Sequence, residues 1–168
     1  MKDDALAKMD TAHAAIVETF TAMPDAALAW LKPGDDYAIG GIVIHLIQSL
    51  DGYIATLAAM QATGFEDTDG PGEDEKAVDA QLMHARRGLT PGERTATFAE
   101  MGEKHARLAD LARRATDAQF ATLVGVRYPG DLVPYPTSVA LIVKWMTEHD
   151  AEHVPHAQQL FAEWQRAH

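Results

Sequence analysis

The sequence of 168 residues contains no cysteine. Disulfide bonds are therefore excluded, and any thiol chemistry would need a thiol from outside the chain. A chain without cysteine suits a reducing compartment. The N-terminus, MKDDALAKMD, carries acidic residues where a secretory signal would carry a basic and then an apolar region. We therefore expect a cytoplasmic protein.

Basic patches and very long apolar runs are also missing. The formal net charge is -11, and the arginine pairs at 86–87 and 113–114 are isolated from one another. Because an acidic surface repels phosphate backbones, we expect no nucleic-acid partner. We expect no hydrophobic run of the length that crosses a bilayer, and therefore no membrane partner.

Four long segments instead carry apolar residues at helical spacing. They cover residues 3–23, 37–62, 90–115 and 137–166, and a shorter helix over 75–87 is expected to cross over them. Asp35 and Asp36 suit the N-cap of the second long helix, and Ser138 or Thr137 suits that of the last. Thr90 and Glu93 have the spacing of a capping box, which predicts a helix start there.

No segment shows a convincing strand pattern, since the apolar runs at 124–128 and 132–135 are too short to argue for a sheet. The length is that of one domain. The sequence therefore predicts an all-α four-helix bundle over residues 1–168, with long connections between helices 2 and 3 and between helices 3 and 4. The acidic loop at 63–74 lacks the spacing of a calcium-binding EF-hand, which favours a solvated loop.

His149 and His153 are the sharpest feature of the sequence. They are four residues apart, so they lie one turn apart on one helix face, together with the apolar Ile142, Trp145 and Leu160. Burying two imidazoles without a partner costs desolvation twice. A metal ion shared by the two rings would offset that cost and would also explain their spacing. We therefore predict metal ligation.

His45 is the best third ligand from another helix. Its face of the second helix carries small residues, including Gly41 and Gly52, which leave room around the ring. Glycine inside a helix is unfavourable, so these positions indicate either close helix contact or a cavity. Three neutral imidazoles leave at least one coordination position open, where a metal polarises an oxygen or sulfur ligand.

The remaining histidines are weaker candidates. His13 and His105 each lie on an apolar stripe, where a hydrogen-bonded core histidine is the simpler interpretation; they either line the pocket beside the metal or lie at another level of the bundle. His84 is expected at the surface. His156 follows His153 by less than a turn and is expected to line the pocket, where it could transfer protons.

Three stretches of the sequence resemble those of a known family. Residues 23–28 lead through Trp30 to Pro33-Gly34, residues 37–46 read YAIGGIVIHL, and residues 149–153 read HDAEH. Over most of the chain the sequence resembles the DinB/YfiT-like superfamily of bacterial metal-binding four-helix bundles. The family places one histidine near the start of the second helix and a His-x3-His pair in the fourth. The resemblance thus implies His45, His149 and His153 as ligands of a divalent metal, zinc or nickel, and a homodimer.

The sequence departs from the family pattern at two neighbouring positions. His156 stands where relatives commonly carry Gln, and Pro155 lies inside the last helix. Pro155 removes the backbone hydrogen bond to the Ala151 carbonyl and invites a kink. It could instead end the helix early, although Leu160 and Trp164 continue the helical period.

Members of this family with assigned activity are similar to transferases of a small thiol such as mycothiol, bacillithiol or glutathione, and others have been described as metal-dependent hydrolases. Our leading hypothesis is a metal-dependent enzyme that transfers an exogenous thiol to an electrophilic small molecule. A second hypothesis uses metal-bound hydroxide on an ester or amide, with Glu152 or His156 as the catalytic proton carrier; Glu152 could equally be a solvated residue. A third is a metal-binding stress protein without turnover.

Pocket candidates by position are Tyr53, Trp145, Arg127 and Tyr135.

Overall fold

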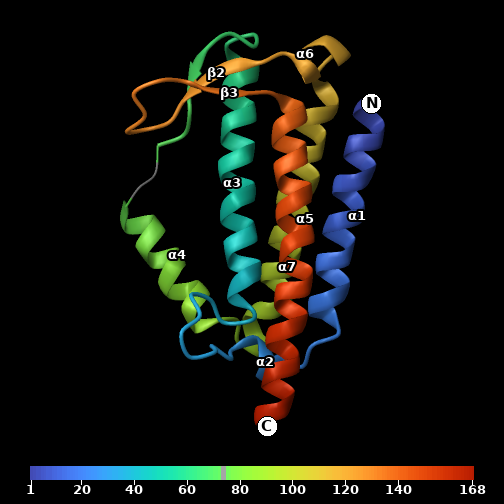
Figure 1. The fold of residues 1–168 in the computed structure, drawn as a ribbon, viewed down its shortest axis with the longest axis vertical. Coiled ribbons are helices and arrows are strands. Elements are labelled where there is room, and N and C mark those ends of the chain that lie inside the picture. Colours follow the sequence, from blue (N-terminus) through green and yellow to red (C-terminus); the bar gives the residue numbers. More distant parts are fainter. Residues whose placement is uncertain (73–74) are drawn as a thin grey trace.

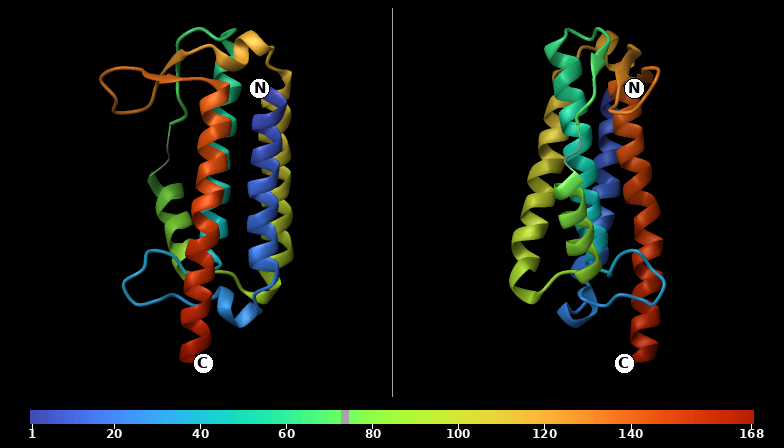
Figure 2. Two further views of the ribbon diagram at one scale, coloured as in Figure 1. Left: turned by 45° about the vertical axis from the view of Figure 1, so that its right-hand side comes forward. Right: turned by 90° about the vertical axis from the view of Figure 1, so that its left-hand side faces the viewer.

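The computed structural model describes residues 1–72 and 75–168. Four long helices run side by side along the molecule (Figures 1 and 2): α1 Lys2–Thr21, α3 Gly41–Ala62, α5 Pro91–Arg114 and α7 Val139–Ala167. α1 packs along α7, and α3 packs along both α5 and α7. The predicted all-α four-helix bundle is confirmed.

The core lies between these four helices and is built from the predicted apolar stripes. Side chains that are at most 4% exposed include Leu6, Met9, Ile16 and Phe20 of α1, Leu46, Leu50 and Leu57 of α3, Met101 and Leu108 of α5, and Ile142, Met146 and Leu160 of α7. Each stripe recurs every three or four residues, so it faces one side of its helix and is covered by the neighbouring helices. On the last helix the predicted Ile142 and Leu160 are buried, whereas the predicted Trp145 is half-buried.

Helix α3 begins four residues later than predicted. Its N-cap is Gly40, with no side-chain cap, so the prediction that Asp35 and Asp36 cap this helix was wrong. The backbone N–H groups before it bond to distant carbonyls instead: Ala38 to Ala85, Ile39 to Trp30 and Gly40 to Leu28. The short helix α2 (Asp25–Leu28) and the loop after it supply the Leu28 and Trp30 carbonyls, and helix α4 (Glu75–Arg87) supplies that of Ala85. Tertiary hydrogen bonds, rather than a local cap, decide where α3 starts.

Two glycines at the start of α3, the N-cap Gly40 and Gly41, lie at a close contact with another segment. A Cβ on Gly41 would lie 1.8 Å from the Ala85 carbonyl oxygen at the end of α4 (Glu75–Arg87), and one on Gly40 would lie 2.7 Å from the Leu28 carbonyl oxygen. Around Gly52 a Cβ would meet no atom within 4 Å. Close backbone contact therefore explains Gly40 and Gly41, and Gly52 makes no such contact.

A small sheet covers one end of the bundle (Figure 1), where no strand was predicted. Its strands are β1 Thr68–Asp69, β2 Val124–Arg127 and β3 Tyr135–Thr137, in the order β1-β2-β3. β1 pairs with β2 in parallel, and β2 pairs with β3 antiparallel. Strands of two to four residues are too short to carry a periodic pattern, and pairing across the fold makes them. A short helix α6 (Asp117–Ala121), also not predicted, directly precedes β2.

The acidic loop packs onto this sheet over the part that the structure describes. Asp67 accepts a hydrogen bond from the Gly125 backbone N–H at 2.7 Å, which ties the loop to β2. Residues 73 and 74, included in the predicted solvated loop, lie outside the described residues. The carboxylate of Asp67 therefore has a structural partner.

Two sequence expectations concerned helix continuity and length. α7 continues through Pro155 to Ala167, so the helix does not end early there. The expectation that no run is long enough to cross a membrane was wrong for α3. This helix of 22 residues contains an 18-residue window with a mean hydropathy of 1.4, so it qualifies by length and composition. A central bundle helix passes the same test because it is surrounded by core, and Leu46, Leu50 and Leu57 of α3 are fully buried.

Candidate metal centre

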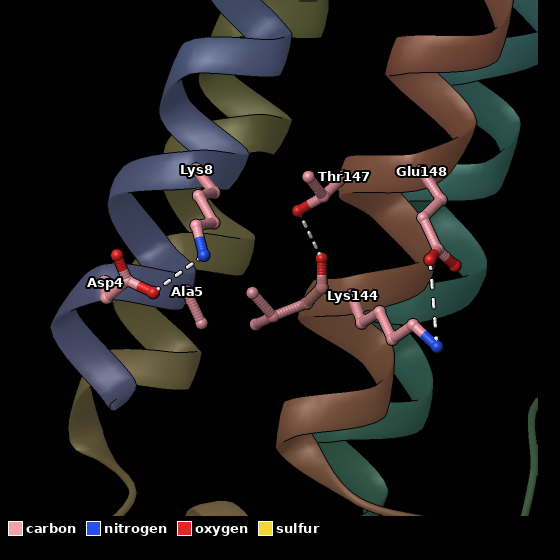
Figure 3. A pocket seen from close by; sticks show the side chains of 7 residues that line it. Asp4, Ala5, Lys8, Lys144, Thr147 and Glu148 are labelled. Carbon is pink, nitrogen blue, oxygen red and sulfur yellow. Dashed lines mark hydrogen bonds and ion pairs between the residues drawn. The ribbon is translucent and has the colours of Figure 1, made fainter.

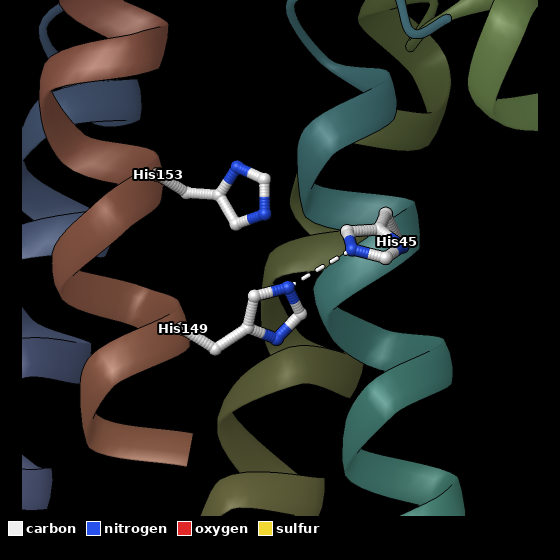
Figure 4. A group of neighbouring side chains, drawn as sticks. All are labelled: His45, His149 and His153. Carbon is white, nitrogen blue, oxygen red and sulfur yellow. Dashed lines mark hydrogen bonds between the residues drawn. The ribbon is translucent and has the colours of Figure 1, made fainter. Parts of the chain in front are cut away.

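Three histidine rings meet between α3 and α7. His45 extends from α3, and His149 and His153 extend from successive turns of α7 (Figure 4). The Nε2 atoms of His45 and His149 are 2.9 Å apart and share a hydrogen bond. One ligand atom from each of the three residues lies within 4.8 Å of the other two. The three histidines selected from spacing are thus brought together by the fold.

The geometry and chemistry of this group fit a divalent metal. In a tetrahedral site with Zn–N bonds of about 2.0–2.1 Å, two ligand nitrogens lie about 3.3 Å apart. The His45–His149 pair would therefore open by only a few tenths of an ångström. Nδ1 of His153 is buried and has no hydrogen-bond partner among the described residues, so ordinary hydrogen bonding does not account for this ring. Three imidazole donors suit zinc or nickel.

Burial keeps these rings in the form that binds metal. The pKa of His45 is lowered to about 4 and that of His153 to about 3, by burial first and by the neighbouring histidines second. Burial also lowers the pKa of His149, against a smaller opposing effect of the Glu152 charge. All three rings are therefore neutral near pH 7, with lone pairs available for a cation.

Other side chains surround the three rings. Tyr37, in the loop before α3, stacks on His45 with ring centroids 4.9 Å apart. The His156 ring lies 5.8 Å from that of His153, and its Nε2 is 3.9 Å from an Asp35 carboxylate oxygen. Sequence reasoning had assigned no site role to Tyr37 or Asp35, because both lie in a loop whose path depends on tertiary contacts.

The two predicted catalytic residues, Glu152 and His156, lie in different surroundings. His156 lies beside His153, as its spacing predicted. Glu152 is exposed on α7 and acts on His149 only through its charge. Of the two, His156 is the one whose side chain contacts the candidate centre.

Three of the predicted pocket residues form an aromatic group. The rings of Tyr53 and Tyr135 lie 6.4 and 6.0 Å from that of Trp145, so α3, β3 and α7 each contribute one ring. Trp145 precedes His149 by one turn on the same face of α7. Arg127, the fourth candidate, is an exposed residue of β2 with no described contact to this group. Tyr128 was not among the pocket candidates named from the sequence, and its hydroxyl lies 3.4 Å from that of Thr56.

His13 and His105 do not belong to the group of three histidines. Their rings stack at 3.9 Å, and His105 Nε2 lies 3.0 Å from a carboxylate oxygen of Asp10. His105 is thus buried and hydrogen-bonded through Nε2, as the interpretation of it as a core histidine predicted. Burial lowers the pKa of His13 to about 4 and raises that of the nearby Asp150 carboxyl to about 7. His84 is 37% exposed, and its Nε2 lies 3.6 Å from Glu93.

A surface depression of about 270 Å³ lies between α1 and α7, away from the three histidines (Figure 3). It is lined by Asp4, Ala5, Lys8, Val143, Lys144, Thr147 and Glu148. Its charges are paired within each helix, Lys8 with Asp4 and Lys144 with Glu148. This depression brings together no group of metal ligands, so the candidate chemistry stays at the histidines.

Solved structures share this fold. YfiT from Bacillus subtilis, described as a probable metal-dependent hydrolase with an unusual four-helix bundle topology, superposes with a TM-score of 0.71 at 21% identity, over 98% of this chain and 87% of YfiT. A mycothiol-dependent maleylpyruvate isomerase gives 0.70 at 11% identity, and this chain covers 59% of its length with 92% of its own. A conserved protein from Enterococcus faecalis gives 0.67 at 13% identity, over 97% of this chain and 98% of that protein.

The sequence itself was also compared with known proteins and families. No curated protein matches it significantly. The family model of the DinB superfamily matches residues 8–157, a stretch that includes all three histidines of the candidate centre. With the match covering most of the chain and the four-helix architecture in place, this protein belongs to the DinB superfamily.

Proposed function

We propose that this protein is a divalent-metal-dependent enzyme that transfers a low-molecular-weight thiol to an electrophilic small molecule. The observation that carries the proposal is the convergence of three neutral imidazoles, from two helices, on one point. His45, His149 and His153 would hold the ion. A divalent ion held by three protein ligands keeps a position open and polarises the oxygen or sulfur of a small molecule bound there.

The residues around the centre have distinct roles in this proposal. Burial keeps the three imidazole rings neutral, so their nitrogens are available to a metal at physiological pH. Tyr37 packs on one face of the His45 ring and limits its rotation. Both effects favour a preformed site.

A substrate and a proton each have a place beside the rings. The aromatic group of Tyr53, Trp145 and Tyr135 offers an apolar wall one to two turns from the centre along α3 and α7. On the other side, His156 is held near Asp35 and is the side chain best placed to accept the proton that a thiol loses. Glu152, exposed on α7, is the weaker candidate for that role.

The similarity to YfiT favours a second candidate function. YfiT is described as a probable metal-dependent hydrolase, and the same three histidines would serve hydrolysis of an ester or amide by water, with His156 or Glu152 moving protons. A binding protein without turnover is the third candidate. All three candidates need the metal, so metal content has to be tested first.

The first test is metal stoichiometry. His149→Ala should abolish the binding of zinc or nickel at this centre, measured by elemental analysis after gel filtration. Glu148→Gln, which changes an exposed carboxylate one residue away, is the matched control and should bind metal like the parent. Unchanged metal content in both His149→Ala and His45→Ala would show that the ligands are misassigned.

The second test separates the functions. The metal-loaded protein is incubated with electrophiles in the presence or absence of mycothiol, bacillithiol or glutathione, and separately with model esters. Consumption of the electrophile only with thiol and metal supports transfer. Ester turnover without thiol supports hydrolysis. Failure of both assays, with metal binding retained, leaves the binding protein.

The remaining partners are also proposals. We propose a homodimer located in the cytoplasm, acting on a small molecule and not on nucleic acid. The exposed Leu132 and Val133, in the loop between β2 and β3, offer apolar surface for a second copy. Light scattering on the purified protein should give twice the 18.3 kDa chain mass, and a monomer mass would exclude the dimer.

A further inference from the structure

A second group of metal-ligating side chains lies in the bundle, contributed by three helices. His13 comes from α1, His105 from α5 and Asp150 from α7. One ligand atom of each lies within 4.8 Å of the others. Asp150 directly follows His149, so on the helix its side chain points about 100° away from the first centre. The two groups thus occupy different sides of α7.

The tautomer of His105 follows from its carboxylate partner. Asp10 lies 3.0 Å from Nε2 of His105 and 3.6 Å from the Arg113 guanidinium. A carboxylate only accepts hydrogen bonds, so Nε2 carries the proton and donates it. In the neutral ring, Nδ1 is then left with a lone pair. That atom is buried and has no hydrogen-bond partner among the described residues.

Asp150 presents a second orphaned acceptor to the same space. Its side chain is only 1% exposed, and its Oδ2 has no hydrogen-bond partner in the part of the chain that the structure describes. In its ionised form, which a bound cation would favour, Asp150 offers only lone pairs, as Nδ1 of His105 does, so neither atom then satisfies the other. A buried carboxylate without a compensating cation is costly. Two such acceptors beside each other indicate a bound electrophile between them.

We propose that His13, His105 and Asp150 form a second divalent-cation site, separate from the centre of His45, His149 and His153. Two imidazole nitrogens and one carboxylate oxygen suit zinc and related first-row ions. Asp10 acts as the outer partner that orients the His105 ring and raises its basicity. The rings of His13 and His105 stack at an angle of 8°, so they would have to turn on binding for their in-plane lone pairs to converge on one ion.

The role of this site is structural. His105 and Asp150 are at most 6% exposed, so the ion has little access for a substrate. It would join α1, α5 and α7, and would therefore cross-link to the bundle two helices, α1 and α5, that the first centre does not reach. The second site therefore does not depend on the proposed enzymatic function.

The test is the number of zinc ions bound by the full chain. Metal-free protein is titrated with Zn²⁺ and bound metal is counted after gel filtration. We expect two equivalents for the parent, one for His45→Ala, one for Asp150→Asn and none for the double variant. Asp150→Asn keeps the shape of the side chain and removes its charge. Glu103→Gln, which removes an exposed carboxylate from α5, is the control and should keep two equivalents.

A second measurement covers the case in which Asp150→Asn folds poorly. In the His45→Ala background, Zn²⁺ should still raise the thermal midpoint, and adding His13→Gln, at a half-buried position, should remove that rise. The proposal is overturned if the parent binds one equivalent and His45→Ala binds none. It is also overturned if Asp150→Asn and His13→Gln both retain two equivalents. If the parent binds one equivalent that is retained in His45→Ala and lost in Asp150→Asn, the proposed function is contradicted and the second site stands.

Discussion

At the scale of residues, Tyr37 is a single ring that orients the candidate metal ligand His45. It stacks on His45 at 4.9 Å with an angle of 18° between the rings. His45 is the only ligand candidate from α3 among the described residues, so its orientation sets the distance across the centre. Changing a side chain that orients a metal ligand typically lowers the metal affinity by about 10- to 100-fold.

Removing this stacking partner should weaken metal binding. Tyr37→Ala frees one face of the His45 ring, and we expect the Kd for zinc to rise by about tenfold, at the lower end of the effects of outer partners. Tyr37→Phe keeps the stacked ring and should bind zinc like the parent. Competition with a chromophoric chelator measures both values. Equal affinities for the Ala and Phe variants would contradict a positioning role for the ring.

Glu93 shows a second residue whose charge state is set by its contacts. Its carboxylate accepts hydrogen bonds from both terminal nitrogens of Arg87 and from the backbone N–H and hydroxyl of Thr90. These bonds, with that of Arg87 foremost, hold the pKa of Glu93 well below its usual range. The ionised form is therefore favoured in the folded protein, at the N-terminus of α5 where a negative charge is also favourable.

This shift predicts how the stability of the protein depends on pH. Because the folded pKa lies below the unfolded value of 4.5, the contribution of Glu93 is complete above that pH and is lost as the pH falls below it. Glu93→Gln should lower the urea midpoint at pH 7, and the difference from the parent should shrink below about pH 4.5. Glu103→Gln on the exposed face of α5 is the control. A difference that stays constant down to pH 3 would show that the charge is not involved.

At the scale of elements, α3 and α4 make their contact through backbone. The Ala85 carbonyl lies so close to Gly41 that no side chain fits between the two segments. The same carbonyl accepts the Ala38 N–H at 3.1 Å and so helps to set the start of α3. That start leads into the first turn of α3 and to His45, so this contact also positions the candidate centre.

The glycines of α3 give a matched pair of substitutions. Gly41→Ala would force α4 away and should destabilise the protein by about 1–3 kcal/mol, as other overpacking changes do. Gly52→Ala meets open space and should stabilise it by about 0.5–1 kcal/mol, because alanine is the better helix former. Urea unfolding of the two variants measures both values. Opposite signs are expected, and a shared sign would contradict the packing described for Gly41.

For the whole molecule, the candidate centre joins helices that are far apart in the sequence. His45 and His149 are separated by 104 residues, and they approach only because α3 packs against α7. An unfolded chain does not hold these rings together, so a metal binds the native state in preference. The metal should therefore report on the stability of the whole bundle.

Zinc should accordingly raise the free energy of unfolding. At a free zinc concentration of 100 times Kd, one site adds about 2.7 kcal/mol. His45→Ala should show a smaller zinc-induced shift of the unfolding midpoint than the parent, and excess chelator should return each protein to its metal-free value. Equal shifts in the parent and in His45→Ala would mean that this centre does not contribute.

Regular helical spacing determined much of this protein without any structure. It indicated the four long helices and their buried faces, because a period of 3.6 residues is a local property of the chain. The pair of His149 and His153 was readable for the same reason, since both lie on one helix. His45 was reached through its small-residue face and the resemblance to the family.

The tertiary structure decided what no local pattern records. The late start of α3 depends on carbonyls from Leu28, Trp30 and Ala85, and the short strands exist only because distant segments pair. The stacking of Tyr37 on His45, and the meeting of His13, His105 and Asp150 in the core, each join residues from separate elements. Such contacts follow from how helices pack and from where loops return, and therefore only the folded chain specifies them.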